Sequence, residues 1–280
     1  KLSLEPLSKK SLTYIAFPKP LFHPFSVVHG LSHRLLRDNT FEDDLRQTIQ
    51  APRPKALRTK KICRQTQINA RLSAKLLNWF KTNGDTYPFR ETGDAYRILV
   101  CEILLRKTTA AQVSKIYNEF FARFPKIESL ASAQVDEILE IIRPLGILER
   151  AYDLNTIAKE VVTKYSGKVP ADPEALTSMK GIGRYIANCV LACAYRKKSP
   201  MVDSNVGRVI CRLLGRAYGK GTPKEDVWIA YSKFAPTRMF REFHYAMIDL
   251  AHKICRPENP MCDLCPLKSH CHYAKSLRRC

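Results

Sequence analysis

Four cysteines near the end of the sequence have a spacing typical of metal ligands. Cys255, Cys262, Cys265 and Cys271 follow the pattern C-x6-C-x2-C-x5-C. One tight turn between the two central cysteines can direct both thiolates at one point, and the outer two close the cage. Four thiolates in so short a segment suit a soft centre, either zinc or an iron–sulfur cluster. Disulfide bonds are the alternative, which we disfavour because nothing else in the sequence indicates a secreted protein.

Two acidic residues occupy positions that need an explanation. Glu102 interrupts the apolar stretch 97–110 (RILVCEILLRKTTA). A buried carboxylate without a partner is costly, so Glu102 is either a functional group, a partly exposed helix residue, or one half of a salt bridge to an arginine such as Arg97. Asp203, within residues 200–206 (PMVDSNV), precedes an expected helix, and by itself it predicts an N-cap.

A glycine pair lies between two expected helices, in residues 179–185 (MKGIGRY). Gly181 and Gly183 would allow a tight hairpin and a close approach of the backbone to a phosphate. The free N–H groups at the start of the second helix would then face the anion. A plain connection between two helices is the alternative reading of this segment.

Composition favours a nucleic-acid partner. The chain of 280 residues has 47 Lys and Arg against 26 Asp and Glu, a formal net charge of +21, and such an excess attracts polyanions. A merely basic protein is the alternative. No apolar run approaches the roughly 18 residues of a membrane span. The remaining cysteines mostly lie in apolar helical stretches, which predicts buried free thiols in a reducing compartment: Cys63, Cys101, Cys189, Cys193, Cys211 and Cys280.

The elements that position these residues are expected to be helices. From about residue 68 onward, apolar residues recur at helical spacing, Pro and Gly separate the segments, and no sustained alternation predicts a sheet. We therefore expect an all-α core with short connections. The stripes include Leu72, Leu76 and Phe80; Ile98, Leu99 and Ile103; Val113, Ile116 and Phe120; Ile157 and Val161; Ile186 and Val190; and Val206, Val209 and Leu213.

The beginning of the chain has a different character. Residues 45–84 carry ten Lys or Arg and no Asp or Glu, and the first part of this run is rich in proline. We expect residues 1–65 to be a basic, poorly ordered extension. It is interpreted as an arm on the DNA backbone, with a transit peptide or a dispensable extension as alternatives.

Taken together, these motifs resemble the endonuclease III-type DNA glycosylases, which combine a helix-hairpin-helix with a [4Fe–4S] cluster loop. The resemblance runs from about Tyr87 to Tyr273, and includes residues 87–90 (YPFR) beside the family's P-W-R element. The hairpin departs from the usual L-P-G-(V/I)-G form, because Met179 and Lys180 replace Leu and Pro. The cysteine spacing resembles that of the family's loop and so implies a [4Fe–4S] cluster rather than zinc.

The resemblance also implies roles for individual residues. Asp203 would face the sugar of the extruded nucleotide, where a carboxylate stabilises positive charge that develops as the N-glycosidic bond breaks. Glu102 would be the general acid/base of a monofunctional enzyme. Tyr185 stands where bifunctional lyases carry a lysine, and a tyrosine cannot form the Schiff base. The residues expected to bind DNA are Lys180, Gly181, Ile182, Gly183 and Arg184 of the hairpin, and Arg106, Lys107 and Thr108.

Within the family, residues 102–110 (EILLRKTTA) and 201–205 (MVDSN) resemble the thymine-DNA glycosylases that act on T·G mispairs. Adenine glycosylases usually have Q-Q-T after the glutamate, where this chain has Arg106, Lys107 and Thr108. We therefore expect a monofunctional glycosylase that removes thymine or uracil opposite guanine by base flipping. Adenine excision from A·G or A·8-oxoguanine mispairs is the alternative enzyme, and a non-catalytic DNA-binding module is the alternative outside enzymes.

The expected fold is all-α, with two helical domains, a helix-hairpin-helix and a cluster loop. Residues 96–199 would form the domain with the hairpin, and residues 66–95 with 200–273 the cluster domain. The expected partner is double-stranded DNA with a mispaired or damaged base, bound by a monomer away from membranes. In a prokaryote the enzyme would lie in the cytoplasm with the nucleoid; an organelle or the nucleus is the alternative elsewhere.

Overall fold

The structure is a computed structural model that describes residues 56–146, 148–219 and 223–277, with side chains from Asn69 onward. Residues 55–280 form one compact unit. The part of the chain that the structure describes contains helices and no strand, as expected for an all-α fold. None of its helices is long and apolar enough to cross a membrane.

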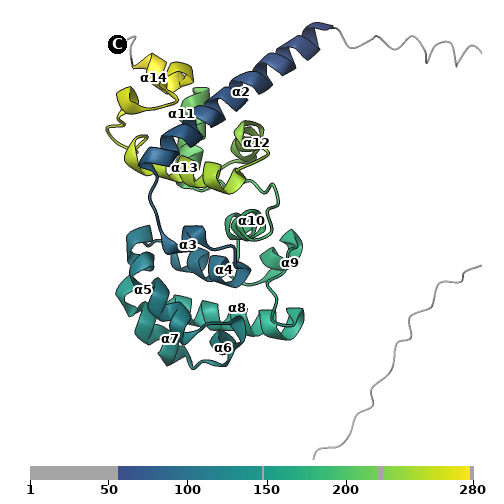
Figure 1. Cartoon of the computed structure of the whole chain (residues 1–280), viewed down its shortest axis with the longest axis vertical. Helices are drawn as coiled ribbons and strands as arrows, with labels where there is room; N and C mark the ends of the chain where they lie inside the picture. The colour runs from purple at the N-terminus through teal and green to yellow at the C-terminus, as the bar shows by residue number, and fades with distance from the viewer. Residues whose placement is uncertain (1–55, 147, 220–222, 278–280) are drawn as a thin grey trace, which may run out of the picture. The chain divides into compact units, whose positions relative to one another are not determined.

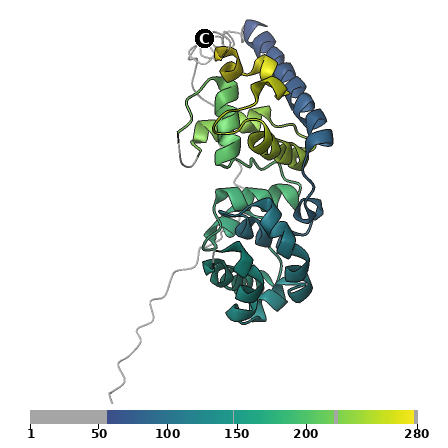
Figure 2. The same ribbon diagram turned by 90° about the vertical axis from the view of Figure 1, so that its left-hand side faces the viewer.

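The helices pair in two groups (Figure 1). In the first group, α6 and α7 pack on α8, α4 packs on α8 and α10, and α9 packs on α10. Figure 2 shows the same grouping from the side. Its members are α3 (Pro88–Glu91), α4 (Ala95–Leu104), α5 (Ala110–Arg123), α6 (Ile127–Ser132), α7 (Val135–Ile142), η1 (Arg143–Leu145), α8 (Glu149–Tyr165), α9 (Pro173–Ser178) and α10 (Arg184–Cys193).

The second group joins the start and the end of the described chain. Helix α13 packs against both α2 and α11, and α12 packs on α2 and α11. Because α10 of the first group also contacts α13, this pair of helices links the groups. Its members are α2 (Ala56–Asn83), α11 (Ser204–Leu214), α12 (Glu225–Phe234), α13 (Phe240–Lys253), η2 (Cys262–Leu264), η3 (Lys268–His270) and α14 (His272–Ser276).

Two boundaries differ from those expected. Residues 56–65, predicted to belong to an irregular extension, form the first turns of α2. The stretch after Pro54 contains no further Pro or Gly until Gly84, so nothing in it interrupts a helix. Helix α3, expected with the cluster domain, packs on α4 and α5 of the first group. The rest of the predicted extension, residues 1–55, lies outside the described residues.

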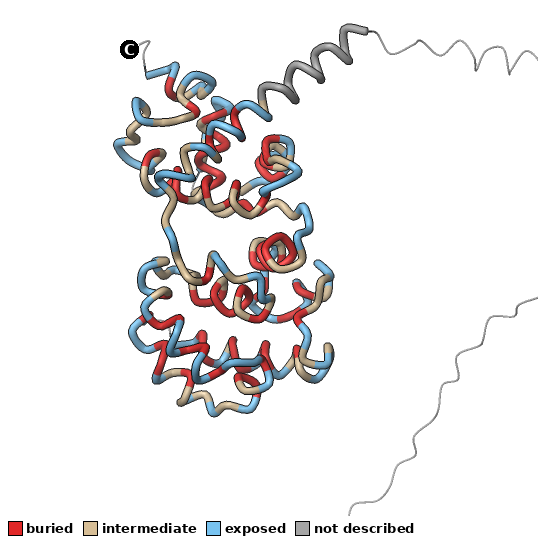
Figure 3. Tube along the Cα trace, in the orientation of Figure 1, coloured by how far each residue is buried: buried red, intermediate tan, exposed pale blue. Residues whose placement is uncertain are grey.

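The core follows the predicted apolar stripes, and buried residues occur in the helices of both groups (Figure 3). Helix α4 is an extreme case, since Ile98 to Cys101 and Ile103 to Leu104 are each at most 3% exposed. Four of the six additional cysteines, Cys101, Cys189, Cys193 and Cys211, are buried and free, as predicted. Cys63 and Cys280 lie outside the residues whose side chains are described.

Candidate active site

Glu102 is the one partly exposed residue in the buried run from Ile98 to Leu104. Burial and the negative charge of Asp203 raise the pKa of Glu102 to about 7, while a hydrogen bond with the Cys189 thiol and the charge of Arg90 act in the opposite direction. A carboxyl group with such a pKa can both give and take a proton near neutral pH. The suggested salt bridge to Arg97 is absent among the described contacts; Arg97 lies over the Phe121 ring instead.

Asp203 is the N-cap of α11, as predicted from its position. One carboxylate oxygen, Oδ1, accepts a hydrogen bond from the Val206 N–H at 2.7 Å. The other, Oδ2, accepts one from the Asn205 amide at 3.0 Å. Two donors on separate oxygens fix the carboxylate plane, so that its direction is set before any ligand arrives.

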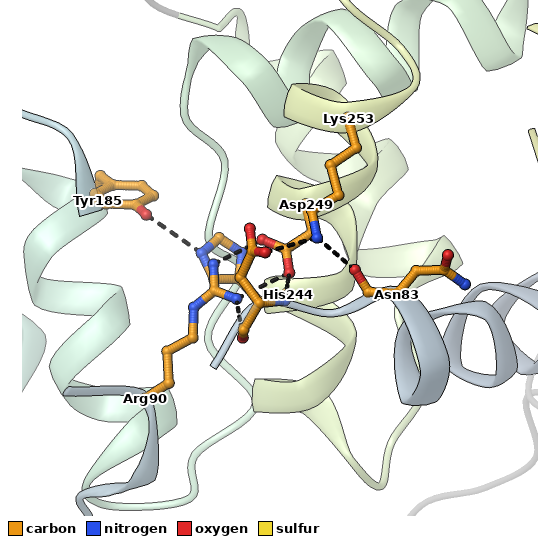
Figure 4. Close-up of polar contacts among 7 residues, drawn as sticks. Asn83, Arg90, Tyr185, His244, Asp249 and Lys253 are labelled. Carbon is orange, nitrogen blue, oxygen red and sulfur yellow. Dashed lines mark hydrogen bonds and ion pairs between the residues drawn. The ribbon is translucent and has the colours of Figure 1, made fainter. Parts of the chain in front are cut away.

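Tyr185 lies on the first turn of α10, near both carboxylates. Burial raises its pKa well above the ordinary value, and the charges of Glu102 and Asp203 add to that effect. Its hydroxyl oxygen is 3.2 Å from Nε2 of His244, which comes from α13 (Figure 4). The structure therefore brings the three predicted catalytic residues together from α4, α10 and the start of α11.

The glycine pair forms the predicted hairpin between α9 and α10. Gly181 has φ +89°, a conformation that side chains rarely adopt, and its carbonyl accepts a hydrogen bond from Arg106 at 3.4 Å. Gly183 has an ordinary φ of −86° and is the N-cap of α10, which has no side-chain cap. A Cβ on Gly183 would meet nothing within 4 Å, so the protein's own packing does not require glycine there. Ile182 between them is buried.

The other residues predicted to bind DNA differ in whether their side chains already have partners within the protein. Arg106 pairs with Asp153 at 2.7 Å, and Arg184 pairs with Glu225 and lies over Trp228. The Thr108 hydroxyl accepts a hydrogen bond from Arg150 at 2.6 Å. Lys180 and Lys107 are exposed, and Lys107 has φ +56°. That these residues and those of the hairpin contact DNA stays a prediction.

A buried ion pair beside this site was not recognised from the sequence. Arg90 of α3 donates two hydrogen bonds to Asp249 of α13, at 2.8 and 2.9 Å, and Asp249 is 1% exposed. Asp249 also accepts a hydrogen bond from the Asp85 backbone N–H at 2.7 Å. The pair joins the two helix groups next to Tyr185 and His244 (Figure 4). Its signal in the sequence is an aspartate within the apolar run 245–251 (YAMIDLA), the pattern that drew attention to Glu102.

The four spaced cysteines lie half-buried along the segment that follows α13. Arg212 of α11 holds this segment, because its guanidinium donates to the carbonyl oxygens of Arg256 at 2.6 Å and Pro257 at 2.8 Å. The same guanidinium lies 3.5 Å from the Cys255 sulfur. The Cys271 thiol donates to the Arg212 carbonyl oxygen at 3.5 Å. No described cysteine is in a disulfide, so the disulfide alternative receives no support.

Burial raises the pKa values of three of the four spaced cysteines. Burial and the neighbouring Cys255 and Cys271 raise the pKa of Cys265 to about 11, and burial also raises the pKa values of Cys262 and Cys271. Thiols in this state need a bound cationic group to ionise. Among the described residues, no group of three His, Cys, Asp or Glu could hold a single metal ion. The donor chemistry of four thiols fits a soft metal centre.

Comparisons with known proteins agree with this architecture. The family described as "HhH-GPD superfamily base excision DNA repair protein" matches residues 100–225. The chain is 42% identical over 208 residues to the thymine-DNA glycosylase of Aeropyrum pernix, covering 72% of this chain and 93% of that protein. It is 38% identical over 201 residues to the thymine/uracil-DNA glycosylase of Pyrobaculum aerophilum, covering 70% of this chain and 87% of that protein.

A solved structure of a thermostable thymine-DNA glycosylase superposes with a TM-score of 0.71 at 32% identity, covering 76% of this chain and 98% of that one. Adenine DNA glycosylases are matched as well, at 29–33% identity. High identity over nearly the whole length of a relative and a shared fold lead to the same conclusion: the chain belongs to the HhH-GPD superfamily of base excision DNA repair proteins.

Proposed function

We propose that this protein is a monofunctional DNA glycosylase that removes thymine or uracil opposite guanine. The observation that carries the proposal is the pair of carboxylates. Glu102 has a pKa raised to about 7 by burial and by Asp203, and Asp203 is held by two donors beside it. A pure DNA-binding module has no use for this costly pair. The names of the relatives, thymine- and thymine/uracil-DNA glycosylase, supply the reaction class.

The two carboxylates have separate tasks in cleavage of an N-glycosidic bond. As the bond breaks, positive charge develops on the deoxyribose, and the fixed negative charge of Asp203 stabilises it. The pKa of Glu102, raised to about 7, lets it hold a proton near neutral pH and donate that proton to the departing base. Water then adds to the sugar, and the proton that it releases returns to the Glu102 carboxylate.

Tyr185 makes the reaction a hydrolysis without strand cleavage. A phenol cannot form an imine with the sugar, whereas a lysine amine can. The Tyr185 ring instead offers a flat face beside the carboxylates, on which a planar base can stack. The expected product is an intact strand with an abasic site.

DNA would be bound at the hairpin and flipped toward the carboxylates. The uncapped N-terminus of α10 and the bare backbone at Gly183 offer N–H groups to a phosphate. Lys180 and Lys107 add positive charge, while Arg106 positions the hairpin through the Gly181 carbonyl. We expect the protein to act on double-stranded DNA as a monomer and to extrude the target base from the stack.

The four cysteines would hold a [4Fe–4S] cluster, namely Cys255, Cys262, Cys265 and Cys271. A [4Fe–4S] cluster takes four thiolates, and these four cysteines are half-buried, follow one another within a short segment and form no disulfide. When bound, the cluster would supply a fixed point that organises the basic segment around Arg212. Its chemistry is not needed for the hydrolysis.

The proposal is tested with duplexes that contain T·G, U·G, A·G, A·8-oxoguanine or thymine glycol, each followed by alkali to cut abasic sites. We expect excision of thymine and uracil opposite guanine, no strand cut before alkali, and little adduct trapped by borohydride. Preferential loss of adenine would favour the alternative enzyme. Efficient borohydride trapping would contradict the monofunctional assignment and require a lysine nucleophile, for which Lys180 is the nearest candidate in the hairpin.

A further inference from the structure

We propose that His244 is a positioning residue that fixes the Tyr185 phenol in the active site. The inference rests on the proposed glycosylase function, and it concerns a residue that no motif identified. His244 lies on α13, is 1% exposed, and its Nε2 is 3.2 Å from the Tyr185 hydroxyl oxygen. Figure 4 shows the phenol of Tyr185 reaching toward His244 from the neighbouring helix group.

The imidazole is itself held on its other side. Its Nδ1 lies 3.5 Å from the hydroxyl oxygen of Tyr231 on α12, and the backbone of Met201 makes a further hydrogen bond with the ring. Met201 is fully buried and precedes Asp203 by two residues. A ring anchored in this way cannot rotate freely, so the hydrogen bond at Nε2 determines where the Tyr185 hydroxyl lies.

The charge state of His244 separates positioning from proton transfer. Burial and the positive charge of Arg90 lower the pKa of His244 to about 3. A neutral imidazole has one nitrogen that donates and one that accepts, so it can hold the Tyr185 phenol on one side while it is anchored on the other. Such a ring carries no positive charge near neutral pH and does not act as a general acid. It acts on the reaction only through Tyr185.

The contact matters because it joins the two helix groups at the reacting centre. Tyr185 comes from α10 and His244 from α13, and these helices also contact each other. The hydrogen bond between Tyr185 and His244 therefore holds the phenol ring beside Glu102 and Asp203. Small displacements of positioning groups, of the order of 1 Å, can cost about 100-fold in rate.

The first test is a set of single-turnover excision rates with the full chain. His244→Phe keeps a buried aromatic ring and removes both nitrogens, and we expect the rate to fall about 10-fold to 100-fold with unchanged DNA affinity. Removal of the hydroxyl in Tyr185→Phe should cause a similar fall. In the double variant the two losses should not multiply, because one hydrogen bond is lost in both. His244→Gln, whose amide can reach the Nε2 position, should recover most of the rate.

Tyr96→Phe is the matched control, because it removes a buried phenol hydroxyl that donates to the Phe124 carbonyl oxygen at 2.8 Å and has no described bond to His244 or Tyr185. We expect its rate to stay within about 2-fold of the unchanged protein. The proposal is overturned if His244→Phe retains the full rate in folded protein, or if the losses of His244→Phe and Tyr185→Phe multiply.

A second measurement does not need the substrate. With ¹⁵N-labelled histidine, the Nε2 resonance of His244, assigned by its disappearance in His244→Gln, should shift in Tyr185→Phe. This NMR measurement remains decisive if His244→Phe does not fold. It also remains decisive if the protein removes none of the tested bases, in which case the proposed function fails. An unchanged resonance would mean that the hydrogen bond does not exist in solution, and the inference would be wrong.

Discussion

The carboxylate site and the cysteine segment differ in what holds their functional residues. Glu102, Tyr185 and Asp203 are carried by helices whose buried faces pack against one another, and backbone or side-chain donors orient each polar group. The four cysteines instead follow one another through turns and two short 3-10 helices, η2 and η3. Packing between helices holds the first set in place, whereas the second is a set of thiols whose pKa values are raised by burial.

The difference suggests where stability comes from in each region. In the carboxylate site, apolar packing of α4 and α10 offsets the free-energy cost of partly burying the Glu102 carboxyl group. In the cysteine segment, the described contacts are hydrogen bonds from Arg212 to backbone carbonyls and few buried apolar side chains, chiefly Leu267 and Ala274. A segment of this kind takes much of its folding free energy from what its thiols bind. A change in one region should therefore leave the other intact.

Loss of the proposed cluster should have the largest effect and should stay local. Cys265→Ala removes one ligand, and a structural metal centre contributes about 10 kcal/mol to its own segment. We expect loss of iron and of absorbance near ~400 nm, and loss of amide protection in residues 255–277 by hydrogen exchange, with protection retained in α4 and α10. Cys211→Ala, which removes a buried thiol outside the motif, should keep its iron. Full iron content in Cys265→Ala would remove the cysteine from the ligand set.

Substitution of Asp203 should reduce catalysis with little change in the fold. Asn caps helices about as well as Asp, so Asp203→Asn keeps the N-cap and removes the charge. We expect the single-turnover rate to fall at least ~100-fold, the scale for loss of a transition-state electrostatic partner. Asp172→Asn is a matched control, because Asp172 caps α9 through the Ala175 N–H at 2.8 Å and lies in no predicted site. Equal rates in the two variants would reduce Asp203 to a structural cap.

Glu102→Gln should change stability with pH in a defined direction. The folded-state pKa of Glu102 is about 7, above its ordinary value of 4.5, so the folded protein binds more protons and loses stability as pH rises through this window. Gln carries no charge, and the variant should therefore be more stable than the unchanged protein at pH 8, by up to about 3 kcal/mol, with the gain vanishing below pH 4.5. Urea unfolding at several pH values measures the difference.

The same substitution tests the role of Glu102 as a proton donor. The single-turnover rate of the unchanged protein should fall as pH rises through about 7, because the donor loses its proton. The rate of Glu102→Gln should be about 100-fold lower and should not fall further as pH rises through about 7. A rate that rises through the same range would identify Glu102 as the base that activates water instead.

The sequence predicted much of this arrangement, and its failures have physical causes. Glu102 and Asp203 drew attention because each sits in a local context that signals cost or capping, effects that act within one helix, and their catalytic roles came from the family resemblance. His244 could not, because its partner Tyr185 is 59 positions away and only packing of α10 on α13 brings them together. For the same reason, the sequence did not predict that Arg106 and Arg184, both expected to bind DNA, pair with Asp153 and Glu225 on other helices. Helix α2 begins earlier than expected, because a high density of Lys and Arg does not end a helix in a stretch that contains no Pro or Gly.

The smallest predicted effect separates the two hairpin glycines. Gly181→Ala puts a side chain at φ +89°, in the left-handed region, and should destabilise the protein by about 1–2 kcal/mol. Gly183→Ala has an ordinary φ and open space around the new methyl group, so the free energy of unfolding should stay within about 0.5 kcal/mol of its present value. If a phosphate approaches the α10 N-terminus, that methyl group stands in its path, and DNA affinity should fall about 10-fold, or roughly 1.4 kcal/mol. Thermal unfolding and fluorescence anisotropy with a labelled duplex measure the two quantities separately. Unchanged affinity in Gly183→Ala would mean that DNA does not contact the hairpin backbone, and the exposed Lys107 and Lys180 would then have to carry the phosphate contacts.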